Sequence, residues 1–310
     1  MLDRKAIDSQ AVSLMLLLSM IWGMQQVALK IAAPDMAPLL QIVFRSAIAA
    51  ILVGAIIFFR PQKMQISGVW IPGLIAGSFF SLEYFFVGAS LHYTSASHVT
   101  VFLYSAPIFV ALALHFIDNN ERLSSIQWLG IGLAFSGIAC TFLLRDNNTD
   151  PQAAQILWGD FLALLAGASW GAVTICVRST KLSSIPAAQT LFYQLAVATV
   201  MLGISAVVTD QTSFTMTAVV ATSLLYQGVI VCSLSFLTWY WLLRQYPASQ
   251  LGVFSFVTPL FGIVFGVWLL GESLESNFIG GASLVLIGIA LVTLRRETIR
   301  NLRAKFTRGS

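Results

Sequence analysis

The sequence predicts an all-α integral membrane protein, and three observations carry that prediction. Of the 310 residues, 57% are hydrophobic and only 10% are charged, with a mean hydropathy of +0.84, whereas soluble domains carry about 25% charged residues. The apolar residues form solid runs of about 20, the length that a membrane-spanning helix needs. A membrane β-barrel would instead show segments of about ten residues with alternating polarity. In lipid, backbone N–H and C=O groups must form hydrogen bonds within the protein, which only helices and closed barrels allow. We therefore expect a helical bundle.

Clusters of Pro, Gly, Asn, Asp and basic residues divide the chain into ten predicted spans. These spans lie at about 12–31, 37–59, 70–92, 97–116, 126–144, 157–178, 186–208, 217–243, 249–270 and 277–295. No connection is long enough to form a separate domain. The longest, 145–156, separates a first unit of five helices (1–145) from a second (146–298), which a basic tail (299–310) follows.

Basic residues in the short loops predict which way the bundle faces. If the N-terminus is cytoplasmic, 14 of the 17 Lys and Arg residues lie on the cytoplasmic side and 2, Lys30 and Arg145, lie outside, with Arg45 inside a span. Both termini are therefore expected in the cytoplasm. The basic tail is interpreted as an anchor on anionic lipid rather than a nucleic-acid site.

The second half of the sequence repeats the first. The matches are Trp22–Gly23 with Trp170–Gly171 and Gln41 with Gln189 at an offset of 148, Gly130 and Gly137 with Gly281 and Gly288 at 151, and Ala96–Ser97 with Ala248–Ser249 at 152. Each half holds five predicted spans, an odd number, so equivalent helices point in opposite directions. Such inverted repeats recur in secondary transporters, where the two units rock around a central site. Repeat parity therefore predicts a carrier with alternating access.

Two prolines also match across the repeat. Pro107 and Pro259, at an offset of 152, each lie about midway along the fourth helix of their half. Proline removes one backbone hydrogen bond and kinks a helix. The pair either widens a central cavity at the same depth in both halves or is tolerated because neighbouring groups satisfy the backbone.

Three stretches resemble a known family. They are IWGMQQVALK at 21–30, FRSAIAAIL at 44–52 and PLFGIVFGVWLLGESLESNFIGGASLVLIGIALV at 259–292. In these the chain resembles the drug/metabolite transporter superfamily, specifically its ten-helix EamA type, over nearly its whole length. The first half departs from the pattern, with Asp118–Glu121 in place of the Leu-Gly-Glu turn.

This resemblance implies a multi-pass carrier or exporter of small metabolites, such as amino acids, in a bacterial inner membrane. It also implies a central cavity lined by helices 1, 3 and 4 and their counterparts 6, 8 and 9. The proton gradient is a common energy source in similar proteins, and no cofactor is expected.

Glu83 is the main candidate site residue, because it lies within the apolar run SFFSLEYFFVG at 78–88. A charge at the bilayer centre costs about 2.5–3.5 kcal/mol on insertion scales, so such residues face the bundle interior or water and usually have a partner. Arg45 is at a similar depth in the preceding span. Three interpretations stay open: a static ion pair with Arg45, recognition of a cationic group on the substrate, or uptake and release of a proton. Arg45 itself is either structural or a binding group for an anion.

Further side chains are candidates for substrate binding or proton coupling, because aromatic walls with a few polar groups hold small ligands. They are Trp22, Gln25, Tyr84, His98, Tyr104, Trp170, Gln227 and Trp239. The alternatives are an aromatic belt near the helix ends and, for His98, an interfacial histidine.

The sequence thus favours a secondary active transporter of amino acids or related metabolites, with protons as a further candidate partner. A lipid or lipid-linked metabolite translocator of the same fold is the alternative. No HExxH, GxSxG or phosphate-binding loop is present, which argues against an enzyme. Cys140, Cys176 and Cys232 lie in apolar runs without metal-ligand spacing. The spacing of Gly262 and Gly266 allows close helix packing, within the bundle in the first place and between two copies as the alternative. We expect a monomer or a homodimer.

Overall fold

The computed structural model describes residues 8–59, 64–117, 122–143, 153–246, 251, 254 and 257–293. Every regular element in this part of the chain is a helix, and the β-structure there amounts to an isolated bridge between Met36 and Phe214. The predicted all-helical class is therefore confirmed. The basic tail, the turn at 118–121 and the start of the span at 249–270 lie largely outside the described residues, and the predictions for them stay predictions.

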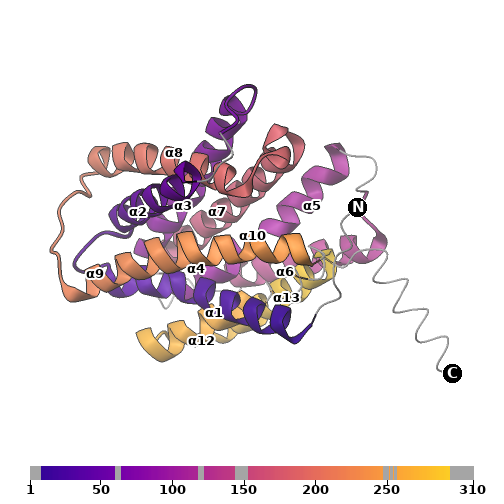
Figure 1. Ribbon diagram of the computed structural model, residues 1–310. Helices are drawn as coiled ribbons and strands as arrows, with labels where there is room; N and C mark the ends of the chain where they lie inside the picture. Colours follow the sequence, from indigo (N-terminus) through magenta and orange to yellow (C-terminus); the bar gives the residue numbers. More distant parts are fainter. Residues whose placement is uncertain are drawn as a thin grey trace.

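The helices lie close to the predicted positions along the chain (Figure 1). In the first half they are α1 (Ser9–Ala32), α2 (Pro38–Phe58), α3 (Trp70–Tyr93), α4 (Ala96–Leu103), α5 (Ala106–Ile117) and α6 (Ser125–Leu143). In the second half they are α7 (Ala153–Ser179), the short 3₁₀ helix η2 (Lys181–Ser184), α8 (Ala187–Val208), α9 (Ala218–Leu225), η3 (Tyr226–Ser235), α10 (Phe236–Gln245), α12 (Val257–Leu270) and α13 (Ser276–Thr293).

Seven helical stretches of the described residues are long and apolar enough to cross a membrane. Three more apolar helices, at 125–141, 257–270 and 276–292, are shorter. Large apolar side chains project from the flanks: Ile51 is 71% exposed, Phe58 82% and Trp268 75%. In water such a surface would drive aggregation, so the flanks are suited to contact with lipid. The described residues support a membrane bundle, and the number of ten spans stays a prediction.

The fourth predicted span is broken in two. α4 ends at Leu103 and α5 begins at Ala106, immediately before Pro107. Proline has no N–H to donate to the carbonyl of residue 103 and crowds that turn. The break is closed locally, because Ser105 donates both its backbone N–H and its hydroxyl to the carbonyl of Phe102, at 3.1 and 2.6 Å.

The eighth predicted span contains a π-helix. Between α9 and α10 the ten residues of η3 adopt the wider helix, in which backbone bonds run from i to i+5. Within it the hydroxyl of Ser233 donates to the carbonyl of Gly228, five residues earlier, at 2.8 Å. Segments of this kind are rare and are frequently found at functional sites.

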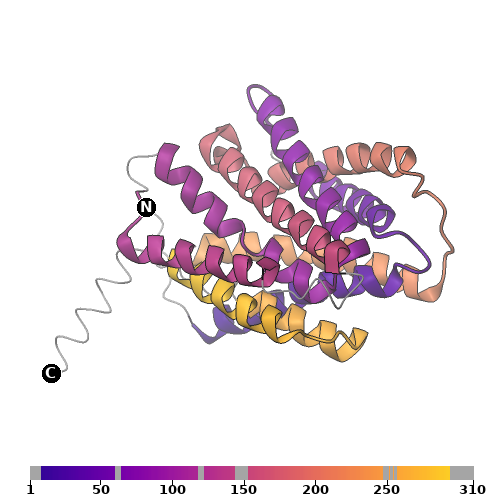
Figure 2. The ribbon, with the colours of Figure 1, turned by 180° about the vertical axis from the view of Figure 1, so that it is seen from behind.

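α6 and α13 pack side by side through glycines (Figure 2). A Cβ on Gly130 would lie 2.7 Å from the carbonyl oxygen of Gly288, and a Cβ on Gly137 would lie 2.5 Å from that of Gly281. Real Cβ atoms essentially never come this close to backbone, so these positions require glycine. In the sequence repeat, Gly130 corresponds to Gly281 and Gly137 corresponds to Gly288. The contacts are crossed: Gly130 packs on the counterpart of Gly137, and Gly137 packs on the counterpart of Gly130.

Two other glycine contacts come in matched pairs. Gly23 approaches Phe261 and the backbone of α12, and Gly171 approaches Phe109 and the backbone of α5. Gly77 packs on Val197 and the carbonyl of Tyr193, while Gly228 packs on Ile48 and the carbonyl of Arg45. In each case the two contacts are related by the offsets of the sequence repeat, 148 to 152 residues.

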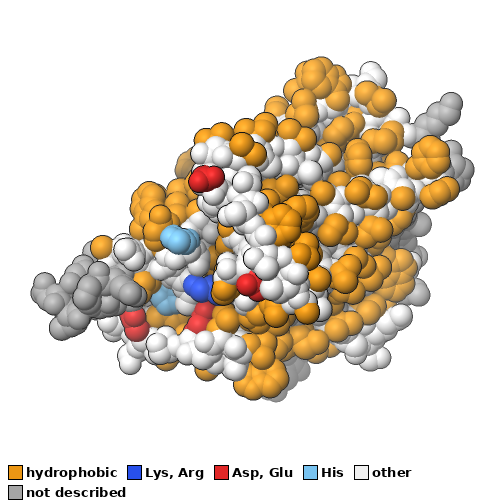
Figure 3. Space-filling model, turned by 90° about the vertical axis from the view of Figure 1, so that its left-hand side faces the viewer, with side chains coloured by type: hydrophobic (Ala, Val, Ile, Leu, Met, Phe, Trp, Pro, Cys, Tyr) orange, Lys and Arg blue, Asp and Glu red, His pale blue; other side chains and the backbone are white. Residues whose placement is uncertain are grey.

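The bundle has two distinct ends. α1 begins and α13 ends at the same end of the bundle, the right-hand one in Figure 1. At the opposite end α1, α3, α8 and α12 terminate and α4, α7, α9 and α13 begin. Figure 3 looks onto this second end, where acidic, basic and histidine side chains gather. It contains Lys30, Thr94, Asp160 and Glu272 and is called the polar end below.

Candidate substrate site

Arg45 is the centre of the candidate site. It lies on α2 and is fully buried. Its guanidinium stacks on the ring of Tyr84 from α3, with 4.1 Å between Cζ and the ring centroid. Nη1 donates to Oε1 of Gln227 from η3 at 3.1 Å. The other two donor nitrogens, Nε and Nη2, are buried without a hydrogen-bond partner.

Glu83 lies one residue before Tyr84 on α3 and is 4% exposed. Its Oε2 atom is buried and makes no hydrogen bond. Arg45 is near enough for its charge to act on this carboxylate, yet the two side chains do not form an ion pair in the described structure. The static pair considered from the sequence is therefore not formed. The described contacts of the guanidinium are instead the ring of Tyr84 and Oε1 of Gln227.

Buried polar groups without partners come from several helices. Within the described residues the atoms are Gln26 Oε1 on α1, Arg45 Nε and Nη2 on α2, Glu83 Oε2 on α3 and Thr258 Oγ1 on α12. More than about 90% of buried polar groups in folded proteins have a partner, and leaving one without costs about 1–3 kcal/mol or more for a charged group. Buried polar atoms without partners are candidates for hydrogen bonds to a substrate.

Several sequence candidates surround these atoms. Gln25 of α1 lies within hydrogen-bonding reach of the phenol of Tyr84. Tyr104, which follows α4, lies beside the hydroxyl of Thr258 and makes an edge-to-face contact with Trp170 of α7, 5.2 Å between centroids. The structure therefore brings Gln25, Tyr84, Tyr104 and Trp170 into one neighbourhood.

A relay of side chains that the sequence did not reveal holds Gln227 in place. The Nε2 atom of Gln227 donates to the hydroxyl of Ser223 at 3.0 Å. That hydroxyl lies 3.2 Å from Oε1 of Gln41 and 3.2 Å from the carbonyl of Ala28. With its amide nitrogen engaged, Gln227 presents its oxygen to Arg45. Matched glutamines at Gln41 and Gln189 were the available signal, but nothing in the sequence linked them to Gln227.

Trp22 and Trp239 form a separate aromatic group. Neither has a described interaction with Arg45 or Glu83. Their rings meet edge to face at 5.9 Å, and Phe236 lies 6.2 Å from Trp22. The indole N–H of Trp22 donates to the hydroxyl of Ser235 at 2.8 Å. The pair therefore connects α1 to η3 and α10.

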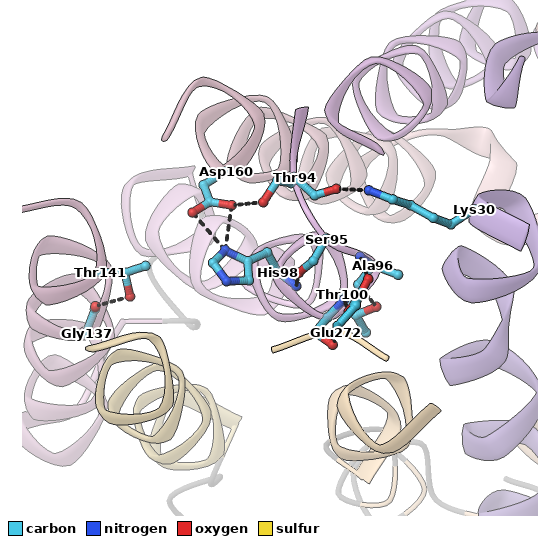
Figure 4. Close-up of polar contacts among 11 residues, drawn as sticks. Lys30, Thr94, Ser95, Ala96, His98, Thr100, Gly137, Thr141, Asp160 and Glu272 are labelled. Atoms are coloured by element: carbon cyan, nitrogen blue, oxygen red, sulfur yellow. Dashed lines mark hydrogen bonds and ion pairs between the residues drawn. The ribbon is translucent and has the colours of Figure 1, made fainter. Parts of the chain in front are cut away.

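His98 lies at the polar end, among Thr94, Asp160 and Glu272, and makes no described contact with Arg45 or Glu83 (Figure 4). Its Nδ1 atom lies 2.8 Å from Oδ1 of Asp160 on α7, and its ring stacks on Phe278 of α13 at 3.7 Å. Asp160 also accepts from the hydroxyl of Thr94 at 2.7 Å. Lys30 of α1 donates to the carbonyls of Leu91, at 3.0 Å, and of Thr94.

The structure gives the glycine and the glutamate of the Leu-Gly-Glu turn in the second half separate roles. Gly271, in the left-handed conformation with φ of 65°, ends α12 and turns the chain. Glu272 then accepts from the backbone N–H groups of Ala96 and Ser97, at 2.6 and 3.0 Å, and from the hydroxyl of Ser97 at 2.6 Å. It thereby caps the N-terminus of α4, where a negative charge is favourable. Gly266 leaves room for this carboxylate.

Comparison with known proteins now identifies the family. A model described as the EamA-like transporter family matches residues 9–143 and again 157–294. The chain belongs to this family. The resemblance stated from its motifs is confirmed, and the chain is a transporter rather than an enzyme.

Relatives of the EamA-like chain are named as transporters. It is 27% identical over 278 residues to YoaV, an uncharacterized transporter of Bacillus subtilis, covering 89% of this chain and 94% of that protein. It is 26% identical over 284 residues to a "Probable amino-acid metabolite efflux pump" of Salmonella typhimurium, covering 89% and 92%. A solved crystal structure matches the fold with a TM-score of 0.63 at 17% identity, covering 92% of this chain and 99% of the other.

Proposed function

We propose that this protein is a secondary transporter that carries amino acids or related small metabolites across a bacterial inner membrane by alternating access. The observation that carries the proposal is the set of unpaired buried polar atoms on α1, α2, α3 and α12. The relative named as an amino-acid metabolite efflux pump supports the same substrate class.

The charges at this site suit a zwitterion. Arg45 keeps two free donors and Glu83 a free acceptor. A substrate with a carboxylate and an ammonium group would pair both, leaving no buried charge uncompensated. A substrate with only one of these groups would leave the other charge unpaired. The aromatic rings of Tyr84 and Tyr104 would contact the apolar part of the molecule.

The proposed mechanism uses two inverted five-helix repeats. Support comes from the glycine contacts, because Gly130 with Gly288 and Gly137 with Gly281 are the reciprocal contacts expected across a two-fold axis. The two separate family matches, to 9–143 and 157–294, support the same division of the chain. Relative motion of such units around a central site is the mechanism of alternating access.

We place the polar end outside the cell and both termini in the cytoplasm. The described residues support this orientation, since the polar end carries Lys30 together with Asp160 and Glu272. At the other end, Arg178 lies in the last turn of α7 and Lys181 follows that helix. Cytoplasmic loops carry the excess of basic residues in membrane proteins.

Coupling to protons through Glu83 is part of the proposal. Glu83, a buried carboxyl group whose Oε2 atom has no partner, takes up a proton when the carrier is empty in this proposal. A substrate ammonium group would then displace that proton, so substrate and proton would move in opposite directions. An imposed pH gradient is therefore expected to accelerate the exchange.

The proposal predicts how substrate analogues behave. In proteoliposomes, an amino acid with both charged groups is expected to be transported, whereas its N-acetyl and methyl ester derivatives should compete roughly 30-fold less well, since losing one partner of a buried charge pair costs about 2 kcal/mol or more. The measurement is inhibition of labelled amino-acid uptake, with and without a pH gradient. Equal competition by all three compounds would exclude the zwitterion site.

A lipid-linked metabolite translocator is the second candidate, and one observation favours it. An apolar groove of about 580 Å³ runs between α2 and the η3–α10 segment, lined by Leu52, Ala55, Ile56, Phe59, Val229, Ser233, Leu234 and Leu237. A groove of this kind could hold an acyl chain. Thermal stabilisation of the purified protein by a lipid-linked compound but by no amino acid would favour this candidate.

A further inference from the structure

The candidate substrate site is closed to solvent in this structure. Arg45 and Gln227 are fully buried, and Glu83 is nearly so. On the side toward the polar end, all eight residues of α4 are buried. If the site exchanges with water at the polar end, as the proposed alternating access requires, the contacts around α4 must separate.

The connection from α3 to α4 is fixed from two sides by hydrogen bonds to one residue. Lys30 of α1 donates to the backbone carbonyl of Thr94, and the hydroxyl of the same Thr94 donates to Asp160 of α7 at 2.7 Å. Asp160 is fully buried and also pairs with His98, on the first turn of α4 (Figure 4). Thr94 thus joins α1 and α7 across the end of α3.

A third anchor comes from the turn between α12 and α13. Glu272 accepts three hydrogen bonds from Ala96 and Ser97, and Phe278 stacks on the ring of His98 with 8° between the planes. The first turn of α4 is therefore held by elements from both halves of the chain. We define Lys30, Thr94, His98, Asp160 and Glu272 as the clasp.

The clasp differs in chemistry from the closure at the opposite end. There α1 meets α10 and the segment after it through an apolar cluster of Met15, Leu18, Leu242 and Leu251, with a hydrogen bond from Tyr246 to Asp8 at 2.8 Å. Apolar surfaces resist separation in proportion to the area exposed to water. Hydrogen bonds and ion pairs are instead exchanged for bonds to water when the partners part, so the clasp can open reversibly.

We propose that the clasp is the gate of the substrate site at the polar end, and that α4 is released from α1, α7 and α13 when this gate opens. Lys30, Thr94 and Asp160 act as positioning residues that stabilise the closed state and do not contact the substrate. The inference rests on the proposed alternating access but assigns residues and chemistry that this mechanism alone does not give.

The chain contains its own reporter for this gate. Cys232, on η3, is 1% exposed and lies near enough to Arg45 and Glu83 to interact with them electrostatically. In a background with Cys140 and Cys176 replaced by Ser, a membrane-impermeant thiosulfonate reagent applied from the polar end can reach Cys232 only when that end is open. Right-side-out and inside-out vesicles expose the two ends separately, and a Cys introduced at exposed Asp210 identifies the polar-end side.

Thr94→Val, which removes one hydrogen bond to a charged group, is expected to raise the labelling rate of Cys232 from the polar-end side about tenfold. Lys30→Met removes two such bonds and is expected to raise the rate at least as much. Each variant removes the hydrogen bonds of one side chain and keeps the contact between Asp160 and His98, so the protein is expected to fold. Asp210→Asn is the matched control at the same end and should leave the rate unchanged.

Two results would overturn the proposal. One is an unchanged labelling rate in both variants while the protein stays monodisperse in detergent. The other is a faster rate from the opposite side only. Because labelling needs no substrate, the outcome is independent of transport: a protein that moves no amino acid can still pass this test, and a proven amino-acid carrier can fail it.

Discussion

Glu83→Gln is expected to lower transport roughly 30-fold or more while leaving the protein at least as stable as the wild type. The substitution keeps the shape of the side chain and replaces a carboxyl group whose Oε2 atom is buried without a partner. Replacing an uncompensated buried charge by a neutral group is neutral or stabilising for the fold. For the substrate, the same change removes the partner of its ammonium group, which costs about 2 kcal/mol or more, or roughly 30-fold in uptake efficiency.

The measurement compares initial uptake in proteoliposomes with the apparent melting temperature in detergent. Asp210→Asn, the same change of acid to amide on an exposed residue, is the matched control and should alter neither quantity. Retained uptake with unchanged pH dependence would remove Glu83 from both recognition and coupling. A large fall in melting temperature would instead assign it a structural role.

Gly137→Ala is expected to destabilise the bundle, whereas Gly132→Ala on the same helix is not. A Cβ at Gly137 would lie 2.5 Å from the carbonyl of Gly281 and 2.8 Å from the backbone nitrogen of Val285, while a Cβ at Gly132 meets nothing within 4 Å. Backbone cannot move aside as a flexible side chain can, so α6 and α13 must separate. Overpacking of this kind costs about 1–3 kcal/mol, and alanine at an open helical position gains up to about 1 kcal/mol over glycine.

The two helices allow a paired test. Gly281→Ala should behave like Gly137→Ala, and Gly280→Ala, whose Cβ is also in open space, like Gly132→Ala. The buried pair is expected to lower the apparent melting temperature by about 5 °C and the open pair to leave it unchanged or raised. Equal effects of all four substitutions would mean that α6 and α13 do not pack closely through these glycines in the membrane.

The sequence identified the pair at the centre of the site but not its geometry. Depth counting placed Arg45 and Glu83 at one level, and the structure places them near enough to interact. It could not show that Tyr84 stacks on the guanidinium, because the orientation of a helix around its axis depends on packing against helices distant in sequence. For the same reason Ser223 and Thr258 gave no signal, since serine and threonine are ordinary residues in membrane helices.

The polar end was the larger omission. His98 was a candidate for the substrate site, and the structure instead pairs it with Asp160. The sequence assigned no role to Asp160, and Glu272 stood out only as the last residue of the Leu-Gly-Glu turn. Their partners, Thr94 and the backbone of Ala96, lie 66 and 176 residues away. Loop charges report on topology, but they say nothing about which side chains meet.

The π-helix in the eighth span has a consequence for how the site could change shape. In an α-helix successive residues are about 100° apart around the axis. If one wide turn of Tyr226–Ser235 tightened to the α form by shifting its backbone bonds one residue, the segment on one side would swivel by about that angle against the other. Gln227 lies at the start of this stretch, so such rewinding would carry its amide away from the guanidinium. A single register step in the main chain could then transmit motion between the centre of the membrane and its surface.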